Sequence, residues 1–536
     1  MKKILVIILF SLINLFAQDS QKQNPGVQLP DFVITGKDVI SVENAKKIPP
    51  PFIPTVSGQF FKPAFSPEDL QIKNVSIPIK GSVIQNDSLN YFKGRIEGGM
   101  GLYANPFLNL NYSQPFANGM LEGYASGFNQ KAIPNVNNSQ KYSIKGGANL
   151  LLFVKENSGF LPGTHFKFGG DYSSLNYYLY NSQNPILKST ALNLSEGHGY
   201  VKIENLLSKY LIFSGIVEDN ITDLKSENLS ENLMNVEGFA KMGFPTFYVG
   251  ASASFKKQFL TDSSSNNVSN YYYLAARPFA ELNVTDLLRA SFGINYAQVR
   301  GDNLFSIYAS GVLKLGNGLS LFGEFSPGTE FLTPKYFLDI NPYFRPQNFN
   351  NLFLKKNAAI NAYLKYEYYR FFEIDGGVKF YNAENLPYFT DASSKGEFMI
   401  KTASAKSYSA FVNLLFHLGP YGRFYGTVEA NRTQDTAVYF IPYFPQFKTS
   451  LNYGYNFSTQ WYGEMNLKYN TGSYIDIQNT KSLSPYFNLG VKLSYQLNPG
   501  FLLTLQLSNL INNKNYLWNG YQDIPLNIVG GLTYQF

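Results

Sequence analysis

Apolar and polar residues alternate with a period of two over most of this chain, from about residue 91 to residue 536. In the stretch FLLTLQLSNL, Phe501 and Leu503 fall on one face, and Thr504 and Gln506 fall on the other. Successive side chains of a β-strand point to opposite faces, so this pattern predicts strands with one apolar and one polar face. The same alternation recurs in SFGINYAQ, LNYGYNFS and FNLGVKLSYQL, and helical periodicity is essentially absent. We therefore expect an all-β structure.

Two kinds of β-rich protein fit such alternation, a soluble antiparallel sandwich and a transmembrane barrel. The alternating segments run to about ten residues or more, longer than the roughly 5–6 residues typical of soluble strands. Their polar faces are dominated by Gly, Asn, Ser and Thr, as expected of a wall that lines water. The connections tend to alternate between tight turns and long polar loops, the asymmetry of an outer-membrane barrel. The tight turns include YANPF (103–107), GNG (316–318), LGPYG (418–422) and LNPG (497–500), and the long loops include 129–140, 261–270 and 332–351.

The alternating segments number about twenty-two, an even count within the range of bacterial barrels. We therefore predict that residues 91–536 form a transmembrane antiparallel β-barrel, because closure of the sheet leaves no edge strand with unpaired backbone groups. The last strand, NIVGGLTYQF, ends on Phe536, with Leu532 and Tyr534 on the same face. A terminal aromatic residue on an alternating strand resembles the signal by which outer-membrane barrels are recognised for insertion. We expect these three residues to be recognised by the barrel-assembly machinery.

The composition supports a surface that faces lipid. Charged residues make up 15% of the chain, whereas soluble domains contain about 25%. Aromatic residues reach 16%, with 40 Tyr and 46 Phe, which suits the aromatic girdles that flank the apolar band of a barrel. The mean hydropathy of -0.17 argues against a helical membrane protein. The charge of +7 is spread without basic blocks, so we expect no nucleic-acid partner, and the absence of cysteine excludes disulfides and thiol catalysis.

The N-terminal part of the chain has a different character. Lys2 and Lys3 precede a mostly apolar stretch, and LFA at 15–17 offers a cleavage site, which predicts a signal peptide over residues 1–17. Residues 18–90 are polar and then rich in proline, as in KKIPPPFIPTVSGQFFKPAF. This composition favours an extended chain over a packed core. We expect residues 18–90 to form an extended periplasmic arm ahead of the barrel.

Several motifs resemble those of the TonB-dependent receptors of the outer membrane. The stretch SNLINNKNY, before the last strand, is similar to the family's NLF(D/N)xxY element. The stretch LDINPYFRPQNFN at 338–350 is similar to its NPxLxPE loop, with Gln347 in place of the usual Glu. Near the start of the chain, LPDFVITGKD resembles the family's TonB box, an extended peptide that pairs with an energy-coupling protein. The residues that match the TonB box are Asp31, Phe32, Val33, Ile34 and Thr35.

This resemblance implies a receptor barrel in contact with outer-membrane lipid, which takes up or binds a substrate with energy from a TonB-type partner. That partner would add a strand to residues 31–35. The chain departs from the family in one respect, because the interval 36–90 is too short for the family's plug domain and carries none of its motifs. Barrels of this width are normally plugged, so the arm, the external loops or a separate partner are the candidates that occlude the lumen.

Residues suited to catalysis or metal binding are sparse. The three histidines, His165, His198 and His417, lie in no metal-binding or hydrolase motif, although the first two could meet across strands. We therefore expect no enzyme activity, no cofactor and no metal site. The best candidate for ligand contact is the loop 332–351, whose aromatic residues could equally pack as a lid. Those residues are Tyr336, Phe337, Tyr343 and Phe344.

Three functions stay open at this point. The first is a receptor that takes up or binds an unidentified substrate, with energy coupled through the N-terminal arm. The second is a non-transporting outer-membrane scaffold, whose arm binds a periplasmic partner. The third is a passive porin, for which the arm would be superfluous.

Overall fold

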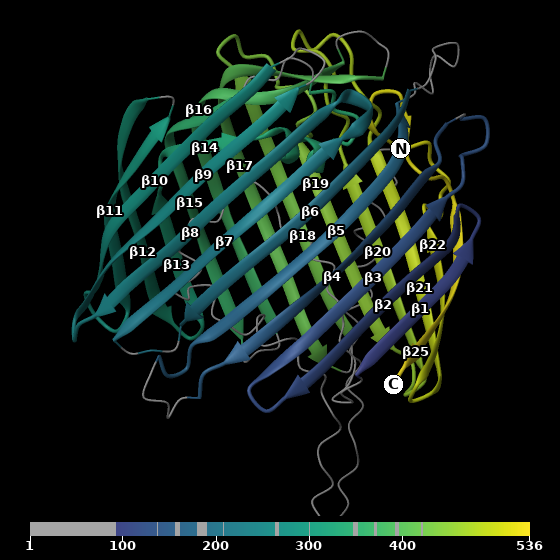
Figure 1. The fold of residues 1–536 in the computed structure, drawn as a ribbon, viewed down its shortest axis with the longest axis horizontal. Coiled ribbons are helices and arrows are strands. Elements are labelled where there is room, and N and C mark those ends of the chain that lie inside the picture. Colours follow the sequence, from purple (N-terminus) through teal and green to yellow (C-terminus); the bar gives the residue numbers. More distant parts are fainter. Residues whose placement is uncertain are drawn as a thin grey trace, which may run out of the picture. The chain divides into compact units, whose positions relative to one another are not determined.

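The computed structural model describes residues 93–536, with gaps at 137, 156–160, 180–189, 207, 209, 263–266, 300, 347–351, 369–371, 392–395 and 420–421. The predicted signal peptide, the predicted arm and the TonB-box-like residues 31–35 lie outside the described residues. The described residues form one sheet of 23 strands, which wraps into a cylinder, and a separate two-stranded hairpin (Figure 1). No helix in this part of the chain is long and apolar enough to cross a membrane.

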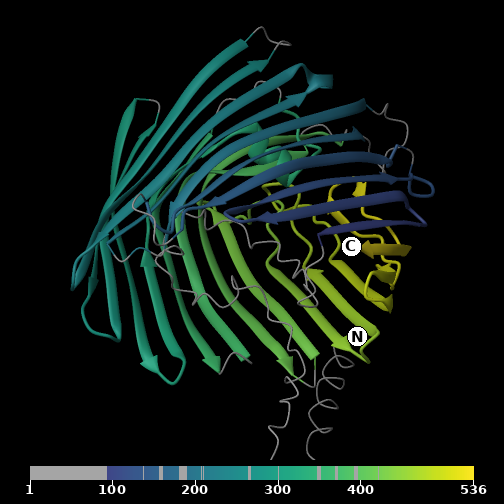
Figure 2. The ribbon, with the colours of Figure 1, turned by 60° about the horizontal axis from the view of Figure 1, so that its bottom comes forward.

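The strands of the sheet follow one another around the cylinder in chain order (Figure 2). The first twelve are β1 (Gly94–Gly101), β2 (Ala104–Phe116), β3 (Gly119–Gln130), β4 (Lys141–Phe153), β5 (His165–Leu179), β6 (Thr190–Asn205), β7 (Leu211–Leu224), β8 (Leu229–Gly243), β9 (Phe247–Asp262), β10 (Asn267–Asn283), β11 (Leu288–Val299) and β12 (Asp302–Gly316). The others are β13 (Leu319–Phe325), β14 (Gly328–Leu332), β15 (Leu352–Tyr368), β16 (Phe372–Asp391), β17 (Phe398–Gly419), β18 (Gly422–Asp435), β19 (Phe447–Asn456), β20 (Trp461–Asn470), β21 (Tyr486–Asn498), β22 (Phe501–Ser508) and β25 (Asn527–Gln535). Outside this sheet are the short helices η1 (Lys225–Glu227) and α2 (Pro334–Ile340), and the hairpin of β23 (Tyr516–Trp518) and β24 (Tyr521–Gln522).

The barrel closes because its first and last strands pair. β1 and β25 form an antiparallel ladder in which Arg95 lies opposite Gln535. β13 and β14 are two halves of one interrupted strand, since both pair with β15 and only Ser326 and Pro327 separate them. The closed barrel therefore has 22 antiparallel strands. The prediction of a transmembrane antiparallel β-barrel with about 22 strands is confirmed.

The two ends of the barrel differ in the length of their connections. β1 begins and β25 ends at one end, where most turns are short, as between β12 and β13, although the connection between β4 and β5 is longer. In that turn Gly316, Asn317 and Gly318 all have positive φ, at 93°, 50° and 80°. A side chain at position 318 would also collide with the backbone carbonyl oxygen of Glu367, so glycine is required there. The opposite end carries the long loops and is therefore the external end.

Two predicted connections differ from the structure. The turn near YANPF consists of Leu102 and Tyr103, because Ala104 already begins β2, and it lies at the external end. Most of the predicted loop 261–270 belongs to strands, since β9 runs to Asp262 and β10 begins at Asn267. The alternation of apolar and polar residues stops where both faces of a strand are exposed to water, but the hydrogen bonds between neighbouring strands continue beyond that point. The pattern therefore marks the lipid-facing part of a strand rather than its full length.

Outward-facing side chains form an apolar band. On β17, Tyr408, Val412 and Phe416 point outward with 53%, 45% and 43% of their surface exposed, whereas Ala405 and Ser407 face inward and are buried. Aromatic residues gather near the end with short turns, as expected of a periplasmic girdle. Neighbouring rings there are in contact in the pairs Tyr366–Phe372, Phe372–Phe416, Phe416–Phe424, Tyr455–Phe457, Trp461–Tyr495, Phe501–Tyr534 and Tyr534–Phe536.

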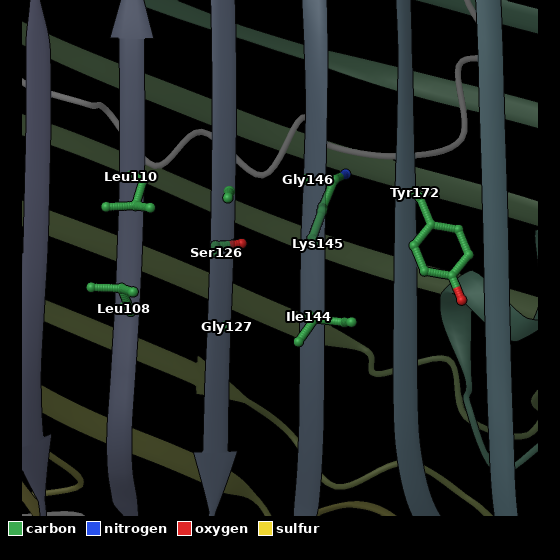
Figure 3. A pocket seen from close by; sticks show the side chains of 9 residues that line it. Leu108, Leu110, Ser126, Gly127, Ile144, Lys145, Gly146 and Tyr172 are labelled. Carbon is green, nitrogen blue, oxygen red and sulfur yellow. The ribbon is translucent and has the colours of Figure 1, made fainter.

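The outer wall of β2 to β5 carries a hollow of about 360 Å³, shown in Figure 3. Its sides are Leu108 on β2, Ile144 on β4 and Tyr172 on β5, which are exposed to 47%, 40% and 50%. Its floor is low because Gly127 and Gly146 have no side chain to fill it. This hollow belongs to the lipid-facing surface and is not a ligand pocket in the lumen.

The C-terminal strand has the geometry expected of an insertion signal. Leu532, Tyr534 and Phe536 all point outward, with 44%, 39% and 48% of their surface exposed. Phe536 also exchanges backbone hydrogen bonds with Gly94, each of 3.0 Å, at the seam that closes the barrel. Recognition of these residues by the assembly machinery stays a prediction.

Candidate functional site

The loop between β14 and β15 turns into the lumen near the external end, and we call its described part, residues 333–346, the lid. The lid begins with α2, which is seen inside the ring of strands in Figure 2. Thr333 is the N-cap of this helix, since its hydroxyl accepts a hydrogen bond from the backbone N–H of Tyr336, and Pro334 follows in the first turn. The sequence TP thus starts a helix where the alternating pattern ends.

A buried carboxylate fixes the lid to the barrel wall. Glu231 on β8 has no exposed surface. One of its oxygens accepts from the backbone N–H of Lys335 at 2.9 Å, and the other accepts from Nε2 of Gln258 at 2.6 Å. The ammonium group of Lys335 lies 2.9 Å from Glu196 on β6 and 3.1 Å from Asp339. Burial raises the pKa of Asp339, although its pairing with Lys335 opposes that shift.

The central residue of the lid is Tyr343, which is only 5% exposed. Its ring stacks on Tyr521 with a centroid distance of 3.3 Å and lies edge-on to Tyr177 at 6.1 Å. The ammonium group of Lys141 lies 5.2 Å from the centre of the same ring. Burial raises the pKa of the Tyr343 hydroxyl above its ordinary value. Tyr343 therefore connects the lid with β4, β5 and the loop before β25.

The last part of the lid is held by two other external loops. The backbone N–H of Phe398 donates to the carbonyl of Tyr343 at 3.1 Å, and that of Arg345 donates to the carbonyl of Phe398 at 2.8 Å. The guanidinium of Arg345 contacts Glu227 in η1 at 3.0 Å and Glu397, just before β17, at 2.6 Å. Charge-assisted pairs of this kind are stronger than neutral hydrogen bonds. Arg345 thus connects three external loops.

The loop between β22 and β25 completes the assembly. Asn509 and Asn515 in the motif SNLINNKNY are each 1% exposed. Asn509 bonds to the backbone of Asn513, and Asn515 exchanges two hydrogen bonds with the backbone of Phe487 on β21. These asparagines support the hairpin of β23 and β24, which presents Tyr521 to the lid. The motif LDINPYFRPQNFN thus contacts, through Tyr343, the hairpin that directly follows the motif SNLINNKNY.

An apolar cluster spans the external end around this stack. Its members come from the loop after β3, from the external ends of β5 to β9 and of β14 to β17, from Ile441 after β18 and from Tyr521 before β25. The fully buried members include Tyr177, Leu224, Leu332, Phe337, Phe344, Phe398 and Ile441.

Three of the four aromatic residues proposed for ligand contact lie inside this cluster. Phe337, Tyr343 and Phe344 are buried, and Tyr336 packs against them. In this arrangement they form a lid, and ligand contact by these residues stays a prediction. The alternation of the sequence did not indicate Glu231, Lys335 or Tyr521 as parts of the same site. The only available signal is Glu231 itself, an acidic residue on the inward face of β8 near the external end of that strand.

Below the lid, the inner wall is polar and charged. His198 on β6 lies 3.2 Å from Asp171 on β5 and 3.5 Å from Glu218 on β7. His165 does not meet His198, because it lies opposite Glu204 and contacts Phe153 instead. No group of His, Asp and Glu among the described residues could hold a metal ion. The wall is thus a water-facing surface of alternating charge.

These features define a class of protein: a closed transmembrane β-barrel of the outer membrane whose external mouth is crossed by its own loops. No protein-family model matches the sequence, and no curated protein matches it. Solved structures of the same fold do match.

The fold is that of the TonB-dependent receptor barrels. The closed form of the ferric-catecholate import receptor Fiu from E. coli K12 matches with a TM-score of 0.61 and 9% identity, over 83% of this chain and 82% of the receptor. The siderophore receptor PirA from Acinetobacter baumannii gives 0.62 and 10% identity, over 84% and 81%. The ferripyoverdine receptor of Pseudomonas aeruginosa gives 0.60 and 14% identity, over 84% and 73%. The resemblance to a receptor-like outer-membrane barrel is thereby confirmed at the level of the fold.

Proposed function

We propose that this protein is an outer-membrane receptor that imports a bulky ligand, with the lid as its external gate and the N-terminal arm as its link to a TonB-type partner. The lid is the observation that best supports this function. A passive porin needs a permanently open mouth, whereas here Tyr343, Arg345 and Lys335 each hold the lid to a different part of the barrel. Opening such a lid requires energy from ligand binding or from a periplasmic partner.

The ligand class is suggested by the proteins that share the fold. Those receptors are named for ferric catecholates, siderophores and ferripyoverdine. Ferric chelates are therefore the first ligands to test on this chain. The fold neighbours are transport receptors, and this agreement supports transport over catalysis.

Cross-linking tests the energy coupling. The chain has no cysteine, so a single cysteine at Val33→Cys reports on the TonB-box-like segment without background. We expect it to form a disulfide with a cysteine-bearing TonB-type C-terminal domain, because strand addition brings the two backbones together. Thr55→Cys, in the proline-rich part of the arm, is the matched control and should not cross-link. Equal cross-linking at both positions, or unchanged uptake after deletion of residues 31–35, would contradict the coupling.

Conductance separates the receptor from the passive porin. The purified protein in a planar bilayer should carry almost no steady current, because the external loops cross the mouth. A large stable conductance would identify an open pore instead. A silent barrel that binds no ferric chelate and supports no uptake would favour the scaffold function.

A further inference from the structure

A pair of cations lies on the outer wall of the barrel, away from the lumen. Lys406 on β17 lies opposite Gln434 on β18, and the next outward residue of β18 towards the periplasm, Arg432, lies opposite Tyr408. Both cations are exposed, whereas the inward-facing residues Ser407 and Thr433 between them are buried. Diagonal neighbours of this kind are about 7–8 Å apart, and their Cβ atoms are somewhat closer. Two long side chains at that separation can hold the same small anion.

The pair lies at the external border of the apolar band. Immediately towards the periplasm from Lys406, Tyr408 packs against Phe380 with a centroid distance of 4.9 Å, and Val412 and Phe416 continue the band. Aromatic residues of this type mark the level of lipid headgroups. Long basic side chains at such a border extend towards the headgroups and keep their stems in apolar surroundings.

No ion pair neutralises the two cations within the described part of the chain. Arg432 donates from Nε to Gln434 at 2.7 Å, which positions the guanidinium but leaves its charge uncompensated. The acidic residue on the neighbouring strand, Glu384, is already engaged by Lys355 at 3.3 Å and Asn357 at 2.7 Å. The site thus combines a local excess of positive charge with an apolar surface directly below it.

We propose that Lys406 and Arg432 form a binding site for the phosphate group of an anionic membrane lipid, whose acyl chains lie on the apolar band below. A guanidinium can hold two phosphate oxygens in a fork, and an ammonium adds a point charge. Tyr408, Val412 and Val428 supply the apolar surface for the chains. The lipid phosphate is favoured over a soluble anion because only a lipid uses both parts of the site.

The test is a titration of the full-length protein in detergent, monitored by native mass spectrometry. The probes are phosphatidic acid, phosphatidylcholine with the same acyl chains, and inorganic phosphate. We compare the wild type, the double variant Lys406→Gln with Arg432→Gln, and the control Lys257→Gln. Lys257 is another outward-facing lysine, on β9, and its ammonium group lies 4.8 Å from the ring of Phe259. All three substitutions are at exposed positions, and gel mobility with and without heating verifies that each barrel is folded.

Phosphatidic acid should bind the wild type more tightly than phosphatidylcholine or inorganic phosphate. Each cation contributes about fivefold near a membrane surface, so the double variant should bind phosphatidic acid about 25-fold more weakly. The Lys257→Gln control should bind as the wild type does. Unchanged affinity in the double variant would overturn the proposal. Inorganic phosphate or phosphatidylcholine binding as tightly as phosphatidic acid would overturn it as well.

Discussion

Replacing Tyr343 by alanine should open the lid without unfolding the barrel. The ring is 5% exposed and contacts Tyr521, Tyr177 and Lys141. Truncation of a buried aromatic ring to alanine costs about 3–5 kcal/mol. No strand ladder includes Tyr343, so this cost falls on the closed lid and not on the sheet. A loss of about 3 kcal/mol raises the ratio of open to closed lid by roughly 150-fold.

A cysteine beneath the lid measures this ratio. Thr222 on β7 has no exposed surface and lies opposite Glu231, the residue that anchors α2. In a chain without other cysteines, Thr222→Cys should react with a membrane-impermeant maleimide only when the lid opens. The rate of labelling then follows the open population. Adding Tyr343→Ala should accelerate labelling by about two orders of magnitude.

Two further variants decide whether the stacked ring is responsible. Tyr343→Phe keeps the ring and should label at nearly the wild-type rate. Tyr439→Ala removes a tyrosine that is 45% exposed in another external loop and should have no effect. If Tyr343→Ala labels no faster than Tyr439→Ala, the lid is not held by this residue and the reasoning is wrong. The thermal unfolding temperature of the barrel should be the same in all variants.

Four other outcomes follow from the structure. Glu231→Ala leaves two donors without their acceptor, which costs about 1–3 kcal/mol, so labelling beneath the lid should also accelerate. Gly318→Val places a side chain against a backbone carbonyl at positive φ, so the variant should show a reduced yield of folded barrel on gels run without heating. Burial raises the pKa of Asp476, but hydrogen bonds from the amide and hydroxyl of Thr480 outweigh burial and lower that pKa below its ordinary value. The contribution of that carboxylate is present above its ordinary pKa and is lost as pH falls through the lowered value, so the exchange protection of the Thr480 amide should decrease as the pH falls below the ordinary pKa of an aspartate. Phe536→Ala should insert more slowly than wild type in a reconstituted assembly assay, and an unchanged rate would contradict the predicted insertion signal.

The barrel could be predicted from the sequence because a lipid-facing strand has a strict local signature. Outward positions must be apolar in lipid, and inward positions may be polar, so a period of two appears within each ten-residue segment. The interruption between β13 and β14 at Ser326 and Pro327, by contrast, cannot be seen in the alternation of apolar and polar residues. The extra length of β9 and β10 beyond the apolar band has no sequence signal for a related reason, since the alternation ends where both faces of a strand are exposed to water.

The lid could be located but not assembled from the sequence. The sequence shows the aromatic residues of the loop and the motifs around Asn341 and Asn509. The sequence does not predict that Tyr343 contacts Tyr521, or that Lys335 contacts Glu196. Such contacts join segments far apart in the chain, and they depend on the closed barrel that brings the loops together. Their formation is a property of the tertiary structure and has no local pattern.

The position of Tyr521 also links the lid to the seam of the barrel. This residue lies in the connection to β25, the strand that pairs with β1 and closes the cylinder. The stack with Tyr343 therefore joins the lid to the connection that leads into the closing strand. The cover of the mouth and the seam of the wall are thus mechanically linked through one aromatic contact, so a change at the seam is expected to reach the lid.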